Sequence, residues 1–432
     1  MVLMLLFGVG FGWLAREVQR ARAQRGAAAA ITELGGSVEY EPASGGAVRS
    51  AVARLGKVFG EDLSADVTIV RFGGTQVNDA GLVHLHGLTQ LRVLFLDDTQ
   101  VTDAGLAHLH GLTHLQWLDL DNTQVSDAGL QHLKWLPELL SLCSSHTSVT
   151  DAGLARIKGL SRLQWLHLDG TQITDAGLVH LKGLTQLQEL DLSQTQTTDA
   201  GLVHLKGLTQ LQELHLSETQ VTDAGLVHLK GLTVLSELDL SGTQVKGSGL
   251  DHVRGLHDLL LLNLADTRIN DVELEHFKGL AQLVGVDLSR TQVTDAGLEH
   301  LKGLTDLQTL NLSDTQVTDV GLERLKGLSG LTALKLPFTQ VTDTGLENIR
   351  GLSRLCYLDL SNTQATDAGL EHLKGLTELM QLELSGTQVT DAGLEHLKGL
   401  TQLRKLNVTR TKVTDAGAND LRKALPNLSI ER

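Results

Sequence analysis

The sequence predicts an α/β solenoid, in which one unit of strand, turn and short helix is repeated along the chain. The main observation is a threonine that recurs every 24 residues from Thr75 to Thr411, which gives 14 intervals and 15 repeats. A second observation is the composition, in which aromatic residues make up 3% and glycines number 45. A unit this short cannot bury its own leucines, so neighbouring units must stack to form a continuous core.

The first half of each repeat is predicted to be a strand. In the unit that begins at Leu91, Leu94 and Leu96 alternate with Val93 and Phe95. Side chains along a strand point to opposite faces in turn, which is the period of two seen here. We therefore expect the leucines to point into the core and the intervening side chains to point outward.

The second half of each repeat is predicted to be a short helix. Thr102 and Asp103 are residue types that cap a helix N-terminus through their side-chain oxygens. Leu106 and Leu109 are three residues apart and share one face of that helix. Gly111 then ends the helix at a position where a left-handed backbone is favourable for glycine.

The strand half, L-x-x-L-x-L-x-x-T-x-V, resembles the L-x-x-L-x-L-x-x-N-x-L pattern of leucine-rich repeat proteins, with Thr99 and its equivalents where Asn is usual. The helix half, V-T-D-A-G-L-x-x-L, resembles the repeats of F-box-type leucine-rich proteins and their bacterial relatives. The apolar N-terminus is similar to that of bacterial envelope-anchored members. The resemblance implies a horseshoe with parallel strands on the concave face and short helices on the convex face. In such a horseshoe, the threonine hydroxyl is expected to replace the Asn side chain in hydrogen bonds to the neighbouring backbone.

Four segments are expected along the chain. They are a hydrophobic anchor or signal-like segment at 1–25, an N-terminal cap at 26–66, the solenoid at 67–424, and a C-terminal cap at 425–432. Within the N-terminal cap, residues 27–34 and 47–59 are predicted helices, with a strand at 37–41 between them. Caps are expected because an open solenoid end would expose the core.

The segment from Met1 to Leu14 is apolar and is followed by arginines. It is shorter than the ~20 residues that a spanning helix needs. A membrane anchor completed by neighbouring residues, a secretory signal cleaved near Ala23, and a buried soluble helix all remain open. We adopt the membrane anchor, which places the protein at the cell envelope on an undetermined side.

Charge and cysteine content limit the possible partners. The net charge of −15 repels nucleic acid phosphates, so no nucleic acid partner is expected. The same field favours a basic protein or peptide. Cys143 and Cys356 lie about nine repeats apart, or roughly 40 Å at ~4.8 Å per strand. A disulfide needs Cα atoms within ~7 Å, so no bond between them is expected.

The candidate binding residues occupy outward positions of consecutive strands. They form an aromatic patch near the N-terminal third and an acidic patch in the middle of the concave face. Exposed tryptophans are typical of binding hot spots, although aromatic packing between strands would give the same pattern. The acidic patch would attract a basic surface, or it could be a solvated face. The residues are Val93, Phe95, Trp117, Trp165, His167, Glu189, Asp191, Glu213, His215, Glu237 and Asp239.

Neither a metal nor a cofactor is expected. His167, Asp191, His215 and Asp239 alternate on successive strands, but a row of side chains about 5 Å apart does not converge on one point. The sequence contains no nucleophile elbow, P-loop or paired-cysteine zinc motif. An enzyme is therefore not expected.

We conclude that the sequence predicts a monomeric, non-enzymatic scaffold that binds a protein on its concave face. The alternative is a substrate-recognition subunit of a ubiquitin-ligase-like complex, as in F-box proteins, but no F-box motif is evident in residues 26–66. A purely structural envelope component is a third possibility. Three irregular positions stand out: Ser144 replaces a core leucine, Gly247 replaces the capping Asp, and Glu273 replaces the helix Gly. We interpret the last two as neutral drift.

Overall fold

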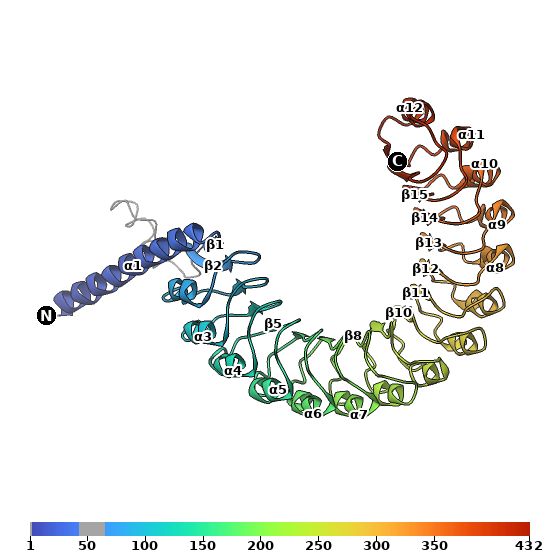
Figure 1. The fold of residues 1–432 in the computed structure, drawn as a ribbon. Helices are drawn as coiled ribbons and strands as arrows, with labels where there is room; N and C mark the ends of the chain where they lie inside the picture. The colour runs from blue at the N-terminus through green and yellow to red at the C-terminus, as the bar shows by residue number, and fades with distance from the viewer. Residues whose placement is uncertain (1, 43–64) are drawn as a thin grey trace. The chain divides into compact units, whose positions relative to one another are not determined.

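The computed structural model describes the backbone of residues 2–42 and 65–432, and side chains from residue 16 onward within those ranges. The chain divides into two compact units, residues 1–196 and 197–432. Within each unit, short parallel strands follow one side of the coil and short helices follow the other (Figure 1). We call the strand side of a unit its strand face.

The first unit opens with a long helix and an antiparallel strand pair. Parallel strands then follow at the 24-residue spacing, so that Val93 lies opposite Trp117 and Ser141 lies opposite Trp165. Its strands are β1 (Ser37–Pro42), β2 (Ala65–Arg71), β3 (Val93–Phe95), β4 (Trp117–Asp119), β5 (Ser141–Cys143), β6 (Trp165–His167) and β7 (Glu189–Asp191). Its helices are α1 (Val2–Glu33), η1 (Asp79–Leu85), α3 (Asp103–Leu106), η2 (Ala107–Leu109), α4 (Asp127–Leu130), η3 (Gln131–Trp135), α5 (Asp151–Ile157), α6 (Asp175–Leu178) and η4 (Val179–Gly183).

The second unit repeats the same coil without an N-terminal cap. Its strands are β8 (Glu213–His215), β9 (Glu237–Asp239), β10 (Leu261–Asn263), β11 (Gly285–Asp287), β12 (Thr309–Asn311), β13 (Ala333–Lys335), β14 (Tyr357–Asp359), β15 (Gln381–Glu383), β16 (Lys405–Asn407) and β17 (Ser429–Glu431). Its helices are α7 (Asp199–Leu202), η5 (Val203–Leu205), η6 (Gly225–Leu229), η7 (Ser248–His252), η8 (Glu273–Gly279), η9 (Gly297–Gly303), α8 (Asp319–Arg324), η10 (Leu325–Gly327), α9 (Asp343–Ile349), α10 (Asp367–Leu370), η11 (Glu371–Gly375), α11 (Asp391–Leu394), η12 (Glu395–Leu397) and α12 (Asp415–Ala424).

The core of each unit is built from the predicted leucines. Leu94, Leu96, Leu106 and Leu109 are fully buried, and their equivalents in later repeats are buried too. The strand residues on either side of the first strand leucine are mostly half-buried, which confirms that alternate side chains leave the core. Ser144 is also fully buried in its leucine position, where its hydroxyl lies 3.1 Å from that of Thr147.

The structure describes parts of both predicted caps and extends the elements expected there. The helix predicted at 27–34 is the end of the longer helix α1, which stops before Gly35 at a positive φ of 85°. The predicted strand at 37–41 is β1, which pairs with β2. The predicted helix at 47–59 lies outside the described residues. At the other end, residues 429–431 add a strand that pairs with β16, so the C-terminal cap continues the sheet.

The Thr-Asp-x-Gly motif joins neighbouring repeats. Thr102 caps its own helix, since its hydroxyl accepts a hydrogen bond from the N–H of Ala104. The prediction that Asp103 caps the same helix is wrong. Its carboxylate instead accepts hydrogen bonds from the N–H of Ser126 at 2.7 Å, the hydroxyl of Ser126 at 2.6 Å and the N–H of Gly129 at 2.9 Å. Each such bond links one repeat to the next.

Thr99, the threonine that recurs every 24 residues, also forms a different hydrogen bond from the one predicted. The Thr99 hydroxyl donates to the carbonyl of Leu96 at 2.6 Å, within its own repeat rather than to a neighbouring one. The hydroxyl lies three residues after this carbonyl, so it closes the turn that follows the strand. The predicted left-handed glycine at the helix end is confirmed at Gly111, where φ is 94°.

Candidate functional site

An aromatic ledge lies on the strand face of the first unit. We define it as Phe95, Trp117 and Trp165, which project from β3, β4 and β6. The ring centroids of Phe95 and Trp117 are 6.4 Å apart, and those of Trp117 and Trp165 are also 6.4 Å apart. The guanidinium carbon of Arg71 lies 5.1 Å from the Phe95 ring. All three aromatic side chains are half-buried, so part of each remains open to solvent.

The two tryptophans meet although a strand lies between them. That strand, β5, carries Ser141 at the position level with both rings. Two strand spacings amount to about 9.6 Å, so the rings lean toward each other over the small serine. Ser141 is fully buried as a result. Val93, opposite Trp117 on β3, is half-buried beside the ledge.

A second group lies at the C-terminal ends of the same strands. We call Asp119, Asp121, Cys143 and His167, with Glu189 behind the imidazole, the thiol cluster. Ligand atoms of Asp119, Asp121 and Cys143 all lie within 4.8 Å of one another. His167 Nδ1 is 3.7 Å from Cys143 Sγ, and His167 Nε2 is 2.8 Å from Glu189 Oε1.

The acidic groups of the thiol cluster oppose one another's ionisation. Burial, together with the neighbouring carboxylates of Asp121 and Asp97, raises the pKa of Asp119 to about 6. Burial also raises the pKa of Asp121. The pKa of the Cys143 thiol lies well above its usual range, because of burial and then because of Asp119 and Asp121.

The order thiol, imidazole, carboxylate resembles a nucleophilic relay, but the electrostatics disfavour that role. A nucleophilic cysteine needs a lowered pKa and access to solvent. Cys143 is only 4% exposed and its pKa is raised. The thiol therefore stays protonated and shielded, as in a structural cysteine.

The remaining predicted residues all lie on a strand face. In the first unit, Glu189 and Asp191 are half-buried on β7. In the second unit, the half-buried outward positions are Glu213 and His215 on β8, and Glu237 and Asp239 on β9. His167 lies opposite Asp191, and His215 lies opposite Asp239, so each pair follows a row as expected. Whether any of these residues contacts a partner stays a prediction.

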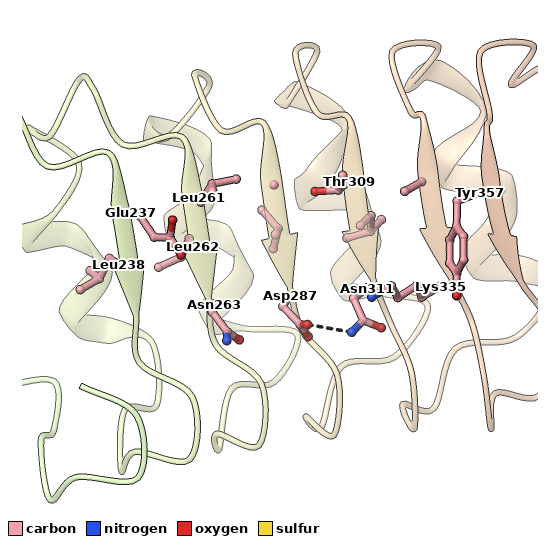
Figure 2. A pocket seen from close by; sticks show the side chains of 14 residues that line it. Glu237, Leu238, Leu261, Leu262, Asn263, Asp287, Thr309, Asn311, Lys335 and Tyr357 are labelled. Carbon is pink, nitrogen blue, oxygen red and sulfur yellow. Dashed lines mark hydrogen bonds between the residues drawn. The ribbon is translucent and has the colours of Figure 1, made fainter. Parts of the chain in front are cut away.

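The strand face of the second unit contains a hollow of about 590 Å³ (Figure 2). Its floor comes from Gly285, Thr309 and Ala333, three small residues in one row of outward positions. Leu261 bounds the row at one end and Tyr357 at the other. This hollow was not predicted from the sequence, although the run of small residues between two large ones is visible once the strands are aligned.

Polar groups border the hollow along one edge. Asn311 donates from Nδ2 to Asp287 Oδ2 at 2.7 Å, the bond drawn in Figure 2. Lys335 Nζ lies 5.9 Å from the centre of the Tyr357 ring. Burial raises the pKa of Tyr357 to about 12, helped by the carboxylates of Asp359 and Glu383. The hollow can therefore accept an apolar side chain whose polar end reaches this edge.

The N-terminal anchor predicted at residues 1–14 falls where the structure describes no side chains. Among the residues that were open to a search, none forms a helix both long and apolar enough to cross a membrane.

A coil of parallel strands backed by short helices, with one buried leucine ladder, defines the class of α/β repeat solenoids. Family models described as Leucine rich repeat match residues 185–245 and 303–326. No curated protein matches the chain. These repeat matches and the strand–helix coil together show that the chain has the leucine-rich repeat fold.

Solved structures share this fold. An internalin from Listeria monocytogenes is 22% identical, with a TM-score of 0.52, over 89% of this chain and 94% of the internalin. A leucine-rich repeat protein of Leptospira interrogans is 21% identical, with a TM-score of 0.61, over 82% and 88%. TLR13, in a complex with ssRNA13, is 20% identical, with a TM-score of 0.52, over 82% and 56%. At these identities the likeness concerns the fold alone.

Proposed function

We propose that this protein is a non-enzymatic scaffold that binds a protein partner through the aromatic ledge. The observation that carries the proposal is the contact between Phe95, Trp117 and Trp165 on an outward face. The chain has only 13 aromatic residues, as 4 Trp, 2 Tyr and 7 Phe, and three of them meet here. Large aromatic side chains are enriched in the hot spots of protein interfaces.

The groups around the ledge favour a partner with basic side chains beside an apolar patch. Asp97, Asp169 and Asp191 are half-buried at or just after strands β3, β6 and β7, and Asp98, next to Asp97, is exposed. Opposite charges around an apolar centre hasten association and select the partner. The same carboxylates would repel a phosphate backbone, so a nucleic acid partner is disfavoured.

The proposal is tested by selecting displayed random peptides on the immobilised full chain. We expect the selected peptides to combine an aromatic or aliphatic residue with Lys or Arg. Trp117→Ala or Trp165→Ala should weaken their binding by at least about 30-fold, the ~2 kcal/mol of a hot spot. Trp135→Ala is the matched control, because Trp135 is 50% exposed but belongs to helix η3 rather than to a strand.

Two results would count against the ledge. One is a set of peptides that binds Trp117→Ala and Trp165→Ala as tightly as the unaltered chain, provided that far-ultraviolet circular dichroism shows both variants to be folded. The other is an equal loss of binding in Trp135→Ala. Binding that strengthens with added salt would contradict the predicted basic partner, since salt screens exposed charges.

No observation favours the ubiquitin-ligase alternative over a general binding scaffold. The relatives with solved structures named above are an internalin, a bacterial leucine-rich repeat protein and TLR13. The protected and protonated Cys143 thiol likewise gives no support to a covalent enzymatic role.

We also propose, from the sequence, that the segment Met1–Leu14 attaches the chain to a membrane at the cell envelope. The apolar run and the following arginines support this proposal. We expect the full chain to sediment with membranes after a high-salt wash, and a variant without residues 1–14 to remain in the supernatant. If the two forms were distributed equally between membranes and supernatant, the proposed anchor would be contradicted.

A further inference from the structure

We propose that the first unit holds a zinc site on its strand face, made by four side chains of the thiol cluster: Asp119, Asp121, Cys143 and His167. This proposal departs from the sequence-based expectation of no metal. Of the four proposed ligands, only His167 belongs to the row of alternating His and Asp residues. The other three lie on β4, on β5 or just after β4. It also stands independently of any partner that the aromatic ledge binds.

The strand register places these side chains on adjacent strands, where the ligand atoms of Asp119, Asp121 and Cys143 converge and His167 approaches the thiol. Asp119 lies opposite Cys143, and Cys143 lies opposite His167, so three adjacent strands each supply one group at the same level. Asp121 follows β4 in the turn, where its carboxylate accepts a hydrogen bond from the N–H of Ser145 at 2.6 Å. That bond turns Asp121 toward β5, and its ligand oxygen comes within 4.8 Å of those of Asp119 and Cys143.

The distance between the thiol and the imidazole suits a shared zinc ion. Zinc binds a cysteine sulfur at ~2.3 Å and a histidine nitrogen at ~2.0–2.1 Å in tetrahedral geometry. Those bond lengths place the sulfur and nitrogen about 3.6 Å apart. Cys143 Sγ and His167 Nδ1 are 3.7 Å apart. The two softer ligands are thus already spaced as a tetrahedral site requires.

Glu189 orients the His167 imidazole in the way that a carboxylate orients a metal-bound histidine. A metal-bound histidine usually presents its second ring nitrogen to a carboxylate, which fixes the ring and its tautomer. His167 Nε2 lies 2.8 Å from Glu189 Oε1, so Nδ1 is left facing the thiol. The side chains of His167 and Glu189 are 28% and 23% exposed, so an ion can reach the site from solvent.

Acidic groups are gathered around the thiol and the imidazole. The Asp119 and Asp121 carboxylates and the Cys143 thiol lie within 4.8 Å of one another, and Glu189 lies behind His167. Ser141, which is fully buried, precedes Cys143 by two residues on β5. A divalent cation would neutralise the carboxylates and would displace the thiol proton into solvent.

The ligand types select zinc over calcium or magnesium. Calcium and magnesium prefer oxygen ligands alone, whereas thiolate and imidazole suit zinc and its neighbours in the transition series. Cobalt(II) is therefore a useful probe, because it takes the same geometry and its bond to a thiolate gives a charge-transfer absorption band in the near ultraviolet.

The test is a titration of the full chain, stripped of metal, first with Co²⁺ and then with Zn²⁺. We expect one equivalent of Co²⁺ to produce the thiolate band, and one equivalent of Zn²⁺ to abolish it by displacement. The 18 histidines of the chain can bind cobalt weakly elsewhere, but they cannot produce this band. The band therefore reports a cysteine ligand specifically.

Two cysteine variants identify which thiol is responsible. Cys143→Ser should lose the band, whereas Cys356→Ser, which removes the half-exposed cysteine of the second unit, should keep it. Because Cys143 is buried and its variant could fold poorly, Glu189→Gln provides a second measurement at a half-exposed position. It should keep the band while weakening Zn²⁺ binding by about 10- to 100-fold.

Each of the following outcomes would overturn the proposal. The unaltered chain could give no thiolate band at one equivalent of Co²⁺. The band could persist in a folded Cys143→Ser variant, or disappear in Cys356→Ser. An unchanged Zn²⁺ affinity in Glu189→Gln would show that the His167 imidazole does not ligate the ion.

Discussion

Gly225→Ala is expected to lower the free energy of unfolding by about 2–4 kcal/mol. Thr222, at the start of the same turn, donates its N–H and its hydroxyl to the Asp199 carboxylate of the preceding repeat, at 2.7 and 2.6 Å. A methyl group on Gly225 would collide with Asp199 Oδ1 and press against Leu202. Displacing the carboxylate breaks two hydrogen bonds to a charged group, each of which contributes about 1.5–3 kcal/mol.

Gly207→Ala is the matched control for this prediction. Gly207 belongs to the same unit, has no positive φ, and offers open space where the methyl group would go. Alanine there reduces the conformational freedom of the unfolded chain, so we expect stability to stay the same or rise by up to about 1 kcal/mol. Urea unfolding followed by circular dichroism compares the two. Equal midpoints would show that the Asp–Gly contact between repeats is unimportant.

The fold was predictable because its determinants repeat within 24 residues. The alternation around Leu94 and Leu96 fixes which side chains enter the core, and an uninterrupted period fixes the register of every strand pair. The outward direction of Trp117 and Trp165 follows from the same alternation. Each of these features is local to one repeat, so a sequence pattern alone contains it.

Features that join different repeats were harder to predict. Within one repeat, Thr102 and Asp103 are both good helix caps, and nothing local shows that the Asp103 carboxylate reaches Gly129 in the next repeat. The thiol cluster was missed for a similar reason. Asp119, Cys143 and His167 occupy equivalent outward positions of successive repeats, but Asp121 belongs to the turn, where the Ser145 N–H holds its carboxylate toward β5.

The irregular residues Gly247 and Glu273 show the same limitation. Read singly, each is a departure from the consensus that neutral drift could explain. In the structure they are neighbours, since a Cβ on Gly247 would collide with the Glu273 side chain. Gly247 occupies the Asp position and Glu273 occupies the Gly position of the following repeat. In the usual contact, the Asp of one repeat faces the Gly of the next repeat. Here the small residue is Gly247 and the large one is Glu273, which indicates that the two departures are coupled.

This exchange predicts strong coupling between the two positions. Gly247→Asp alone should destabilise the second unit, because the new carboxylate would meet that of Glu273 and because φ at Gly247 is 121°. Glu273→Gly alone should also destabilise it, by leaving an empty space and a more flexible helix start. The double variant should recover the usual contact, in which the carboxylate accepts the N–H of Asn270, as Asp271 does for Thr294.

We expect the double variant to be more stable than the sum of the single effects by about 1–3 kcal/mol, the range of coupling between residues in contact. Loss of the buried, unpartnered Glu273 Oε2 offsets part of the destabilisation in the single and the double variant alike, so it does not contribute to the coupling. Urea midpoints of all four proteins in the cycle measure the coupling. Combining Glu273→Gly with Gly255→Ala, where an added methyl group meets open space, should give additive effects. Additive effects in the Gly247 cycle as well would mean that the contact between the two positions contributes no coupling energy.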